Sequence, residues 1–424
     1  MSRLWRLAAI ACALALALSG CGSGSGSRSA PGEHETPAPS TAASTAAAAA
    51  PMLDPAVEKR LLAHAAQRLA EAADRLTPHD GYPRSTGPDG RWQLGDADNW
   101  TSGFFAGSLW LMDEQTGDPV WRTRAERWTA GLELQKTRTD THDLGFVIFD
   151  SFGWQYQLTN DPHARDVAVQ AARSLATRFN PAVGAIKSWD VDPNDPETPG
   201  WRFPVIIDNL MNLQLLFWAA GQPGGDPAFA QLATRHALTS TRVHLRPDGS
   251  TAHVALFDPV TGAFQRQETW QGQSATSTWS RGQAWAIHGF TDAYRESMRP
   301  ELLDAAQRAA DWYLARLPSD RVPYWDFEAP DIPRAPRDAS AAAIAASGLV
   351  ELGRLTAEER GAGYRRAAQD ILASLASSYL TLGTPNQAVL AHSVGSFRQD
   401  SEVDVGLVYA DYYLLEAISR LHRQ

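Results

Sequence analysis

The chain has 424 residues, and its formal net charge of −10 excludes the broad basic surface typical of nucleic-acid-binding proteins. Both of its cysteines, Cys12 and Cys21, fall within the first 21 residues, so the remainder must fold by burial alone, without a disulfide. The histidines and carboxylates show no close metal-ligand spacing, and we expect neither a metal nor a cofactor.

The first 20 residues are typical of a signal for export. Arg3 and Arg6 precede an apolar run, residues 7–18, that is too short to span a bilayer. The run ends in Leu18-Ser-Gly-Cys21, which resembles the signal-peptidase site of bacterial lipoproteins and predicts a lipid on Cys21. Cleavage near Gly20 without lipidation is the alternative. Because Gly22 rather than Asp follows, we expect anchoring at the outer membrane or periplasmic face, with the lipid as the only membrane contact.

The processed chain divides into a tether and one large domain. Residues 21–51 are rich in Gly, Ser, Ala, Pro and Thr, a composition that cannot bury a core and predicts a flexible segment. Residues 52–424 carry no internal linker, and they are predicted to form a single folded domain.

The periodicity of this domain is helical nearly throughout. Twelve helices are predicted, in chain order: Pro55–Leu76, Thr101–Glu114, Val120–Lys136, Asp143–Leu158, Ala164–Phe179, Val205–Ala220, Ala228–His244, Trp279–Ser297, Glu301–Leu317, Ala339–Gly353, Ala357–Tyr379 and Glu402–Leu421. Odd-numbered helices have charged faces, whereas even-numbered ones are rich in Gly, Ala and aromatic residues. This alternation indicates buried inner helices surrounded by amphipathic outer ones, and it predicts an all-α (α/α)6 barrel of six helical hairpins.

One segment departs from the helical pattern. Residues 251–266 alternate in polarity around the turn Asp258-Pro-Val-Thr-Gly262, which predicts a short β-hairpin. In a barrel whose inner helices all point the same way, the polar starts of these helices meet at one mouth. We expect the hairpin to lie over that mouth.

The stretch from Phe203 to Trp218 provides the sharpest chemical candidate. Pro204 suits a first helical turn, and the apolar residues that follow enclose a single carboxylate, Asp208. Asp208 either caps the backbone or pairs with an arginine such as Arg281, or it faces a cavity with a raised pKa and transfers protons. Asp143, at the start of the preceding inner helix, is a candidate second carboxylate, although Asp is also a common helix cap.

Other side chains near the expected mouth suit a sugar ligand. Trp100, Trp189, Trp270, Trp279 and Trp285 offer flat apolar faces with a polar edge, although each is equally suited to core packing. Arg281 could bind a substrate carboxylate through two parallel hydrogen bonds or form an ion pair with Asp208 or Asp338. His253, in the hairpin, is a candidate for a sugar hydroxyl, with a surface histidine as the alternative.

Six motifs occur in order along the chain: Trp100-Thr-Ser-Gly-Phe104, His142-Asp-Leu-Gly-Phe146, Ile207-Asp-Asn-Leu-Met-Asn212, Trp279-Ser-Arg-Gly-Gln-Ala-Trp285, Asp338-Ala-Ser-Ala-Ala-Ala-Ile344 and Glu402-Val-Asp-Val-Gly-Leu-Val-Tyr409. Together they resemble the unsaturated glucuronyl hydrolases of glycoside hydrolase family 88. The resemblance implies an (α/α)6 barrel that removes a 4,5-unsaturated uronic acid from the non-reducing end of polysaccharide-lyase products.

The resemblance also implies roles for individual residues. Asp208 matches the general acid/base of the family and Asp143 its second essential carboxylate. Residues that match or adjoin the family's sugar site are Trp100, His142, Trp189, His253, Gln271, Trp279, Arg281 and Trp285.

A further motif bears on the substrate. Ser393-Val-Gly-Ser396-Phe-Arg398 resembles a Ser-x-x-Ser-x-Lys pattern that holds a sulfate in some members, with Arg in place of Lys. This favours sulfated disaccharides of the heparin or chondroitin type, unless the segment is only a loop before the last helix. Three alternatives remain: hydrolysis of unsaturated rhamnogalacturonyl fragments of pectin, ordinary inverting hydrolysis, and a glycan-binding lipoprotein without catalysis.

Overall fold

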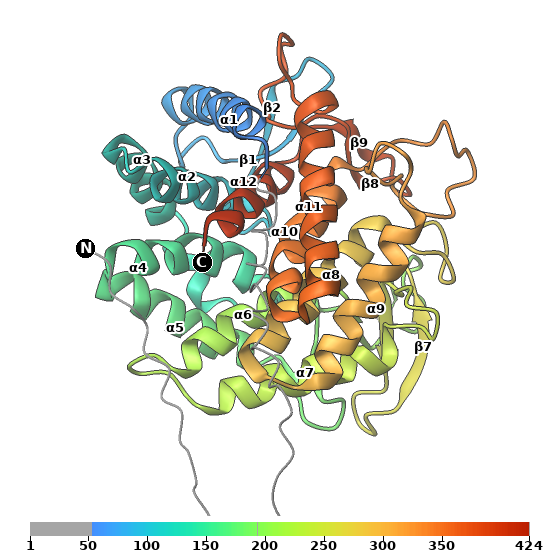
Figure 1. Ribbon diagram of the computed structural model, residues 1–424. Coiled ribbons are helices and arrows are strands. Elements are labelled where there is room, and N and C mark those ends of the chain that lie inside the picture. Colours follow the sequence, from blue (N-terminus) through green and yellow to red (C-terminus); the bar gives the residue numbers. More distant parts are fainter. Residues whose placement is uncertain (1–52, 193, 424) are drawn as a thin grey trace, which may run out of the picture. The chain divides into compact units, whose positions relative to one another are not determined.

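The protein is described by a computed structural model that covers residues 53–192 and 194–423 (Figure 1). The predicted signal, the lipid site Cys21 and all of the tether lie outside these residues. Within them, no helix combines the length and the apolar character needed to cross a bilayer.

Six inner helical segments form a closed ring. They are α2 (Ser102–Thr116), η2 with α4 (Gly145–Gly153 and Trp154–Thr159), α6 (Asn209–Ala220), α8 (Ser280–Ser297), α10 (Ala339–Leu355) and α12 (Val408–His422). Each packs against the next, and α12 returns to α2. The predicted (α/α)6 barrel is therefore confirmed.

Six outer helices surround the ring. They are α1 (Pro55–Arg75), α3 (Pro119–Ala130), α5 (Pro162–Ala176), α7 (Ala228–Val243), α9 (Pro300–Arg316) and α11 (Glu358–Ser378). Their charged faces point outwards and their Ala- and Leu-rich faces are buried, as the amphipathic pattern predicts. Inner helices such as α10 and α12 are instead buried on nearly every face.

Glycines allow the inner helices to approach closely. A Cβ atom on Gly103 of α2 would lie 2.0 Å from the carbonyl oxygen of Phe146 in η2. A Cβ atom on Gly289 of α8 would similarly lie 2.4 Å from Cβ of Leu210 in α6. Since neither position has room for a side chain, the small residues set the distance between neighbouring segments of the ring.

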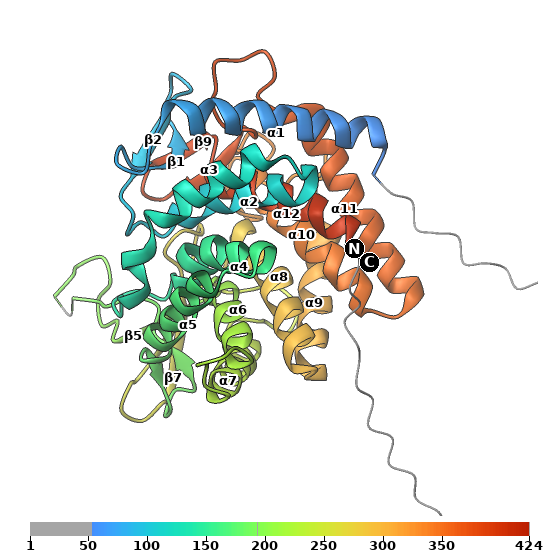
Figure 2. The same ribbon diagram turned by 90° about the vertical axis from the view of Figure 1, so that its left-hand side faces the viewer.

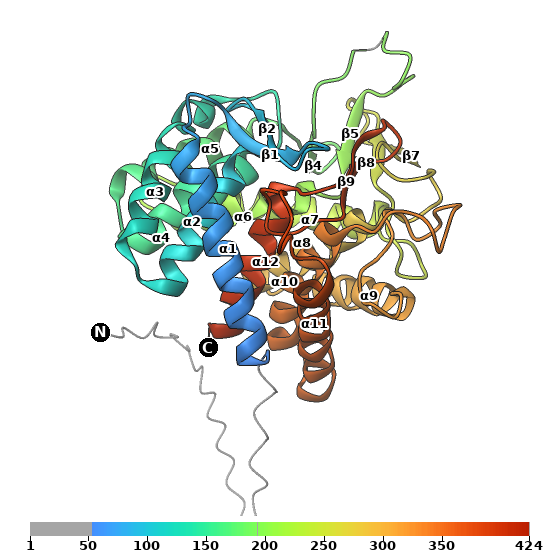
Figure 3. The same ribbon diagram turned by 90° about the horizontal axis from the view of Figure 1, so that it is seen from above.

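Short strands gather at one end of the barrel. They are β1 (Tyr82–Thr86), β2 (Trp92–Gly95), β3 (Phe179–Asn180), β4 (Ala185–Ile186), β5 (Phe203–Ile206), β6 (Val254–Phe257), β7 (Phe264–Glu268), β8 (Ser393–Ser396) and β9 (Ser401–Val405). Figure 3 shows the labelled strands at the end opposite the C-terminus, and Figure 2 shows the same separation from the side. The inner helices begin at this end, which we call the mouth.

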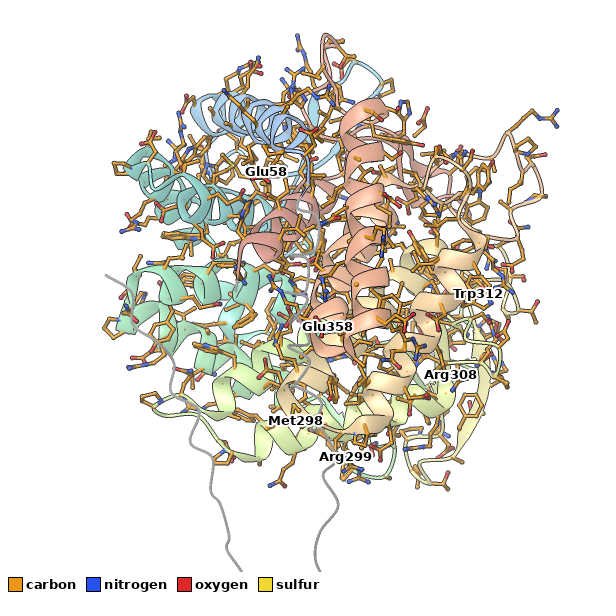
Figure 4. The ribbon with its side chains drawn as sticks, in the orientation of Figure 1. Glu58, Met298, Arg299, Arg308, Trp312 and Glu358 are labelled. Carbon is orange, nitrogen blue, oxygen red and sulfur yellow. The ribbon has the colours of Figure 1, made fainter. Side chains whose placement is uncertain are left out.

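The other end of the barrel, away from the mouth, contains buried charges. Arg420 of α12 contacts Asp292 of α8 at 3.2 Å and Glu416 at 3.3 Å, and His288 contacts both carboxylates at 2.9–3.0 Å. Each buried carboxylate therefore faces an opposite charge, which offsets the cost of its burial. Residues of this end, including Glu58, Met298, Arg299 and Glu358, are labelled in Figure 4 together with Arg308 and Trp312 of α9.

The predicted helix Val205–Ala220 starts too early. Residues 203–206 form strand β5, which pairs antiparallel with β6, and α6 begins only at Asn209. Pro204 is tolerated because β5 is an edge strand of the sheet β5-β6-β7. Asp208 consequently stands at the N-cap of α6 rather than one turn inside it.

Two other helix boundaries also differ by several residues. The predicted helix Glu402–Leu421 begins as strand β9, and α12 starts at Val408. The predicted helix Val120–Lys136 ends at Ala130 and is followed by a 3-10 turn, η1 (Glu133–Thr137). The predicted hairpin is confirmed as β6 and β7, but β5 joins it to make three strands.

Candidate active site

A cavity of about 460 Å³ opens at the mouth of the barrel. Its wall includes ten of the side chains predicted from the sequence: Trp100, His142, Asp143, Trp189, Asp208, Trp270, Gln271, Trp279, Arg281 and Ser396. The two candidate carboxylates, Asp143 and Asp208, therefore share one compartment lined by tryptophans. They come from the starts of adjacent inner segments, where the chain direction of the barrel brings polar residues together.

Asp208 is placed as a proton donor. Its Oδ1 atom is buried without a hydrogen-bond partner, and its side chain makes no capping bond to α6. Burial, and then the charge of Asp143, raises the pKa of Asp208 to about 7. The carboxyl group therefore keeps its proton close to neutral pH and can give it to a bound substrate.

Asp143 is held in place by its neighbours. It precedes η2, accepts a hydrogen bond from Thr141 Oγ1 at 2.7 Å, and lies 3.3 Å from His142 Nε2. The ring of His142 is buried, and burial lowers its pKa although the charge of Asp143 opposes the shift. The π-helical form of η2 widens the turn after Asp143, a distortion often found at functional sites.

Two groups of aromatic rings line the cavity. Trp189 and Trp270 both pack against Trp201, with ring centroids 6.2 and 6.1 Å from that of Trp201. In the other group, the ring of Trp100 lies 5.0 Å from the ring of Tyr409. These flat apolar walls with polar groups between them suit a sugar ring.

Arg281 lines the cavity, but most of its guanidinium group is engaged by the protein. Its side chain is 1% exposed, and Nη1 lies 3.2 Å from Asp338 and donates to the carbonyl of Val394. Its Nη2 donates to the carbonyl of Gly395 at 2.6 Å, while Nε has no partner. Of the two predicted pairings, the structure shows the one with Asp338.

His253 does not lie on the cavity wall. It is buried, and its Nδ1 accepts the backbone N–H groups of Trp270 and Gln271, both at 3.2 Å. Its ring packs against that of Trp279 at a tilt of 39°, with the centroids 4.5 Å apart, and burial lowers the pKa of His253 well below the ordinary value. The geometry thus makes His253 a neutral support for the loop that carries Gln271, neither an exposed strand residue nor a residue of the cavity wall.

Three further predicted residues also lie away from the wall. Trp285 is 1% exposed and packs against Phe146 and Tyr413 in the core, because it lies more than one turn inside α8. Ser393 is fully buried in β8, and its Oγ has no partner. Arg398 is exposed beyond β8, where its Nη1 lies 3.4 Å from the carbonyl of Thr269. Of the three side chains predicted to hold a sulfate, Ser393, Ser396 and Arg398, only Ser396 lines the cavity.

The structure adds wall residues that sequence reasoning did not single out: Arg84, Gln399, Ser401, Glu402 and Tyr409. Glu402 and Tyr409 bound one of the six motifs, so a signal for them was present. Arg84 lies outside all six motifs, and only the pairing of β1 with its neighbours brings it to the mouth. Among the residues that the structure describes, no cluster of three or more His, Cys, Asp or Glu side chains is arranged to hold a metal ion.

Comparison with known proteins agrees with this geometry. Residues 63–328 match the family model of glycosyl hydrolase family 88. An unsaturated glucuronyl hydrolase of Formosa agariphila is 44% identical over 76% of this chain and 80% of its own length. One from Bacillus sp. (strain GL1) is 38% identical over 81% of this chain and 92% of its own. An unsaturated chondroitin disaccharide hydrolase of Streptococcus pyogenes is 33% identical over 81% of this chain and 86% of its own length.

Solved structures extend the likeness to the whole barrel. An unsaturated glucuronyl hydrolase specific for heparin superimposes with a TM-score of 0.82 at 39% identity, covering 87% of this chain and 97% of its own. A variant of the unsaturated glucuronyl hydrolase from Streptococcus agalactiae, complexed with dGlcA-GalNAc6S, has a TM-score of 0.73 at 30% identity. The match covers 88% of this chain and 93% of that structure's chain. The barrel, the paired carboxylates and these relatives lead to one conclusion: the chain is a glycosidase that belongs to glycosyl hydrolase family 88.

Proposed function

We propose that the protein removes the 4,5-unsaturated uronic acid from the non-reducing end of glycosaminoglycan-lyase products. The observation that carries this proposal is Asp208, whose pKa of about 7 leaves it protonated beside Asp143 in a tryptophan-lined cavity. The names of the relatives support the same substrate class, since they are unsaturated glucuronyl hydrolases and unsaturated chondroitin disaccharide hydrolases.

The chemistry follows from the vinyl ether of the substrate. Asp208 donates its proton to C4, and the positive charge that forms is shared between C5 and the ring oxygen. Water adds at C5 and returns a proton to the Asp208 carboxylate, giving a hemiketal. The hemiketal opens, the leaving sugar departs from C1, and the carboxylate is again protonated. No group of the protein attacks the anomeric carbon, so the carboxylate separations of ordinary glycosidases do not apply.

Individual side chains receive roles from their positions on the wall. Asp143 keeps the pKa of Asp208 high and stabilises the positive charge that develops at C5 and the ring oxygen. Trp100, Trp189 and Trp279 provide surfaces for the sugar rings. Gln271 donates to the carbonyl of Gly395 at 2.9 Å, and its amide oxygen is suited to accept a sugar hydroxyl.

A sulfate on the leaving sugar is the finer part of the proposal. Ser396 lines the cavity, and Arg398, two residues further along the same loop, is exposed with its Nη1 3.4 Å from the carbonyl of Thr269. Hydroxyl groups, loop N–H groups and a guanidinium suit a sulfate. The S. agalactiae complex shows that a related enzyme accepts a sulfated disaccharide.

We further propose that the protein is exported and anchored by a lipid on Cys21, at the outer membrane or the periplasmic face. The support is in the sequence: a basic start, a short apolar run and Leu18-Ser-Gly-Cys21.

The catalytic proposal is tested with Asp208→Asn. The substitution removes the transferable proton with little change in shape, so we expect a folded protein without activity. The readout is loss of the ultraviolet absorbance of the conjugated enoate in a panel of lyase-generated disaccharides, with and without sulfate. The control Asp166→Asn changes an exposed carboxylate on α5 and should retain full activity. Near-normal turnover by Asp208→Asn would remove Asp208 from the mechanism.

A further inference from the structure

Two arginines lie on the described wall of the cavity, and they differ in how their charge is used. The guanidinium of Arg281 is 1% exposed and is shared among Asp338 and two backbone carbonyls. Arg84, from strand β1, is 35% exposed at its side chain. An incoming anion therefore meets Arg84 at far lower desolvation cost than Arg281.

Arg84 is held along one edge and open along another. Its Nε donates to Oε1 of Glu402 at 2.6 Å, and its Nη2 donates to Oε2 at 3.3 Å. Its Nη1 makes no hydrogen bond to the residues that the structure describes. A guanidinium has five N–H donors in a fixed plane, so one carboxylate on the Nε edge leaves the Nη1 donors for a second anion.

The position of Glu402 is unusual in its backbone. Its φ of +57° lies in the left-handed region, which is costly for a residue with a side chain. The hairpin of β8 and β9 also makes room for its carboxylate, because a Cβ on Gly395 would lie 2.3 Å from Glu402 Oε2. Two local features thus place this one carboxylate against Arg84, on the wall of the cavity.

We propose that Arg84 binds an anionic group of the substrate through its Nη1 edge, and that Glu402 is the positioning residue that orients it. The group is a planar carboxylate or a sulfate ester, both of which match a guanidinium edge. The inference rests on the proposed function, whose substrates carry a uronate carboxylate and, in the sulfated forms, a sulfate as well. Arg84 then contributes to substrate selection, while Asp208 performs the chemistry.

The test compares Arg84→Gln with the wild-type enzyme on three substrates. These are a non-sulfated unsaturated chondroitin disaccharide, its 6-sulfated counterpart, and the methyl ester of the non-sulfated compound. A charge-assisted hydrogen bond contributes roughly 1.5–3 kcal/mol, which corresponds to a rise in KM of about 10- to 100-fold at little change in kcat. The matched control is Arg91→Gln, since Arg91 lies in the turn of the same β1–β2 hairpin with its side chain 80% exposed.

The substrates identify which anion Arg84 binds. If it binds the uronate, KM rises for both acids and not for the methyl ester; if it binds the sulfate, KM rises only for the sulfated disaccharide. Arg84→Lys keeps the charge without the planar fork and should recover part of the loss.

Some results would overturn the proposal. One is a KM within twofold of wild type on all three substrates. Another is an equal loss on all three together with a lower melting temperature, which would show a purely structural ion pair. The proposed function fails separately, if the wild-type enzyme removes the enoate absorbance from none of the substrates.

Discussion

At the scale of single residues, the surroundings of Asp208 set its pKa, and this pKa affects both proton donation and the stability of the fold. In the unfolded chain this group has an ordinary pKa of 3.8, and in the folded protein burial and Asp143 raise it to about 7. The folded state therefore binds the proton more tightly than the unfolded state. The group's contribution to stability is complete below the unfolded pKa and is lost as the pH rises towards 7. The active site thus gives up stability at neutral pH to keep an acid protonated.

This shift predicts the pH dependence of the reaction. We expect kcat/KM to fall on the alkaline side with an apparent pKa near 7, as Asp208 loses its proton. Asp143→Asn removes the charge that supports the shift, so the alkaline limb of its residual activity should move to lower pH. If the alkaline limb of the Asp143→Asn profile stays at the pH of the wild type, this electrostatic coupling between the two carboxylates is contradicted.

The stability of the protein gives an independent readout of the same pKa shift. Asp208→Asn should raise the melting temperature more at pH 8 than at pH 5.

At the scale of elements, the sequence predicts the barrel well because alternate helices differ in composition. The uncharged, mainly apolar stretch after Asp208 indicates an inner helix, and the charged face of residues 358–366 indicates an outer one. The predicted starts of α6 and α12 were too early, because strands precede both helices. Residues 203–206 pair with the distant strand β6, where Val205 faces Ala255, and such a partner is invisible in a local pattern. Residues 401–405 instead pair with the adjacent strand β8, and this short hairpin runs directly into α12. Arg84 was missed because only the folded barrel brings it to the distant Glu402. Trp285 was assigned to the cavity because its motif begins at the mouth, although Trp285 itself lies more than one turn inside α8.

The ring of inner helices predicts opposite effects for two glycines. Gly103→Ala would place a methyl group 2.0 Å from the carbonyl oxygen of Phe146, so α2 and η2 must separate, and we expect a loss of about 1–3 kcal/mol. Gly363→Ala, on the exposed face of α11 with no atom within 4 Å, should instead gain roughly 0.5–1 kcal/mol. Urea unfolding measures both. Equal changes in the free energy of unfolding in the two variants would show that packing at Gly103 does not set the distance between α2 and η2.

At the scale of the whole molecule, the proposed lipid anchor gives a prediction about location. Cys21→Ser removes the only thiol that can carry the lipid after processing, so the enzyme should move from the membrane fraction to the soluble fraction with unchanged kcat/KM. Fractionation and labelling with a radioactive fatty acid measure this. Ser19→Ala, next to the same site but without a thiol, is the control and should remain labelled. Retention of Cys21→Ser in the membrane fraction would argue against lipid anchoring.

The place where the chain enters the barrel has a consequence for an anchored enzyme. Helix α1 begins beside His422, which contacts Glu58 at 2.7 Å, and this is the end away from the strands (Figure 3). Helix α10 alone has 17 residues, or about 25 Å of length, between the two ends. Negative lipid headgroups act over a Debye length of only about 8 Å in physiological salt. Under the proposed anchoring through Cys21, a barrel whose α1 end faces the bilayer would receive acidic oligosaccharides at its mouth beyond the range of this repulsion.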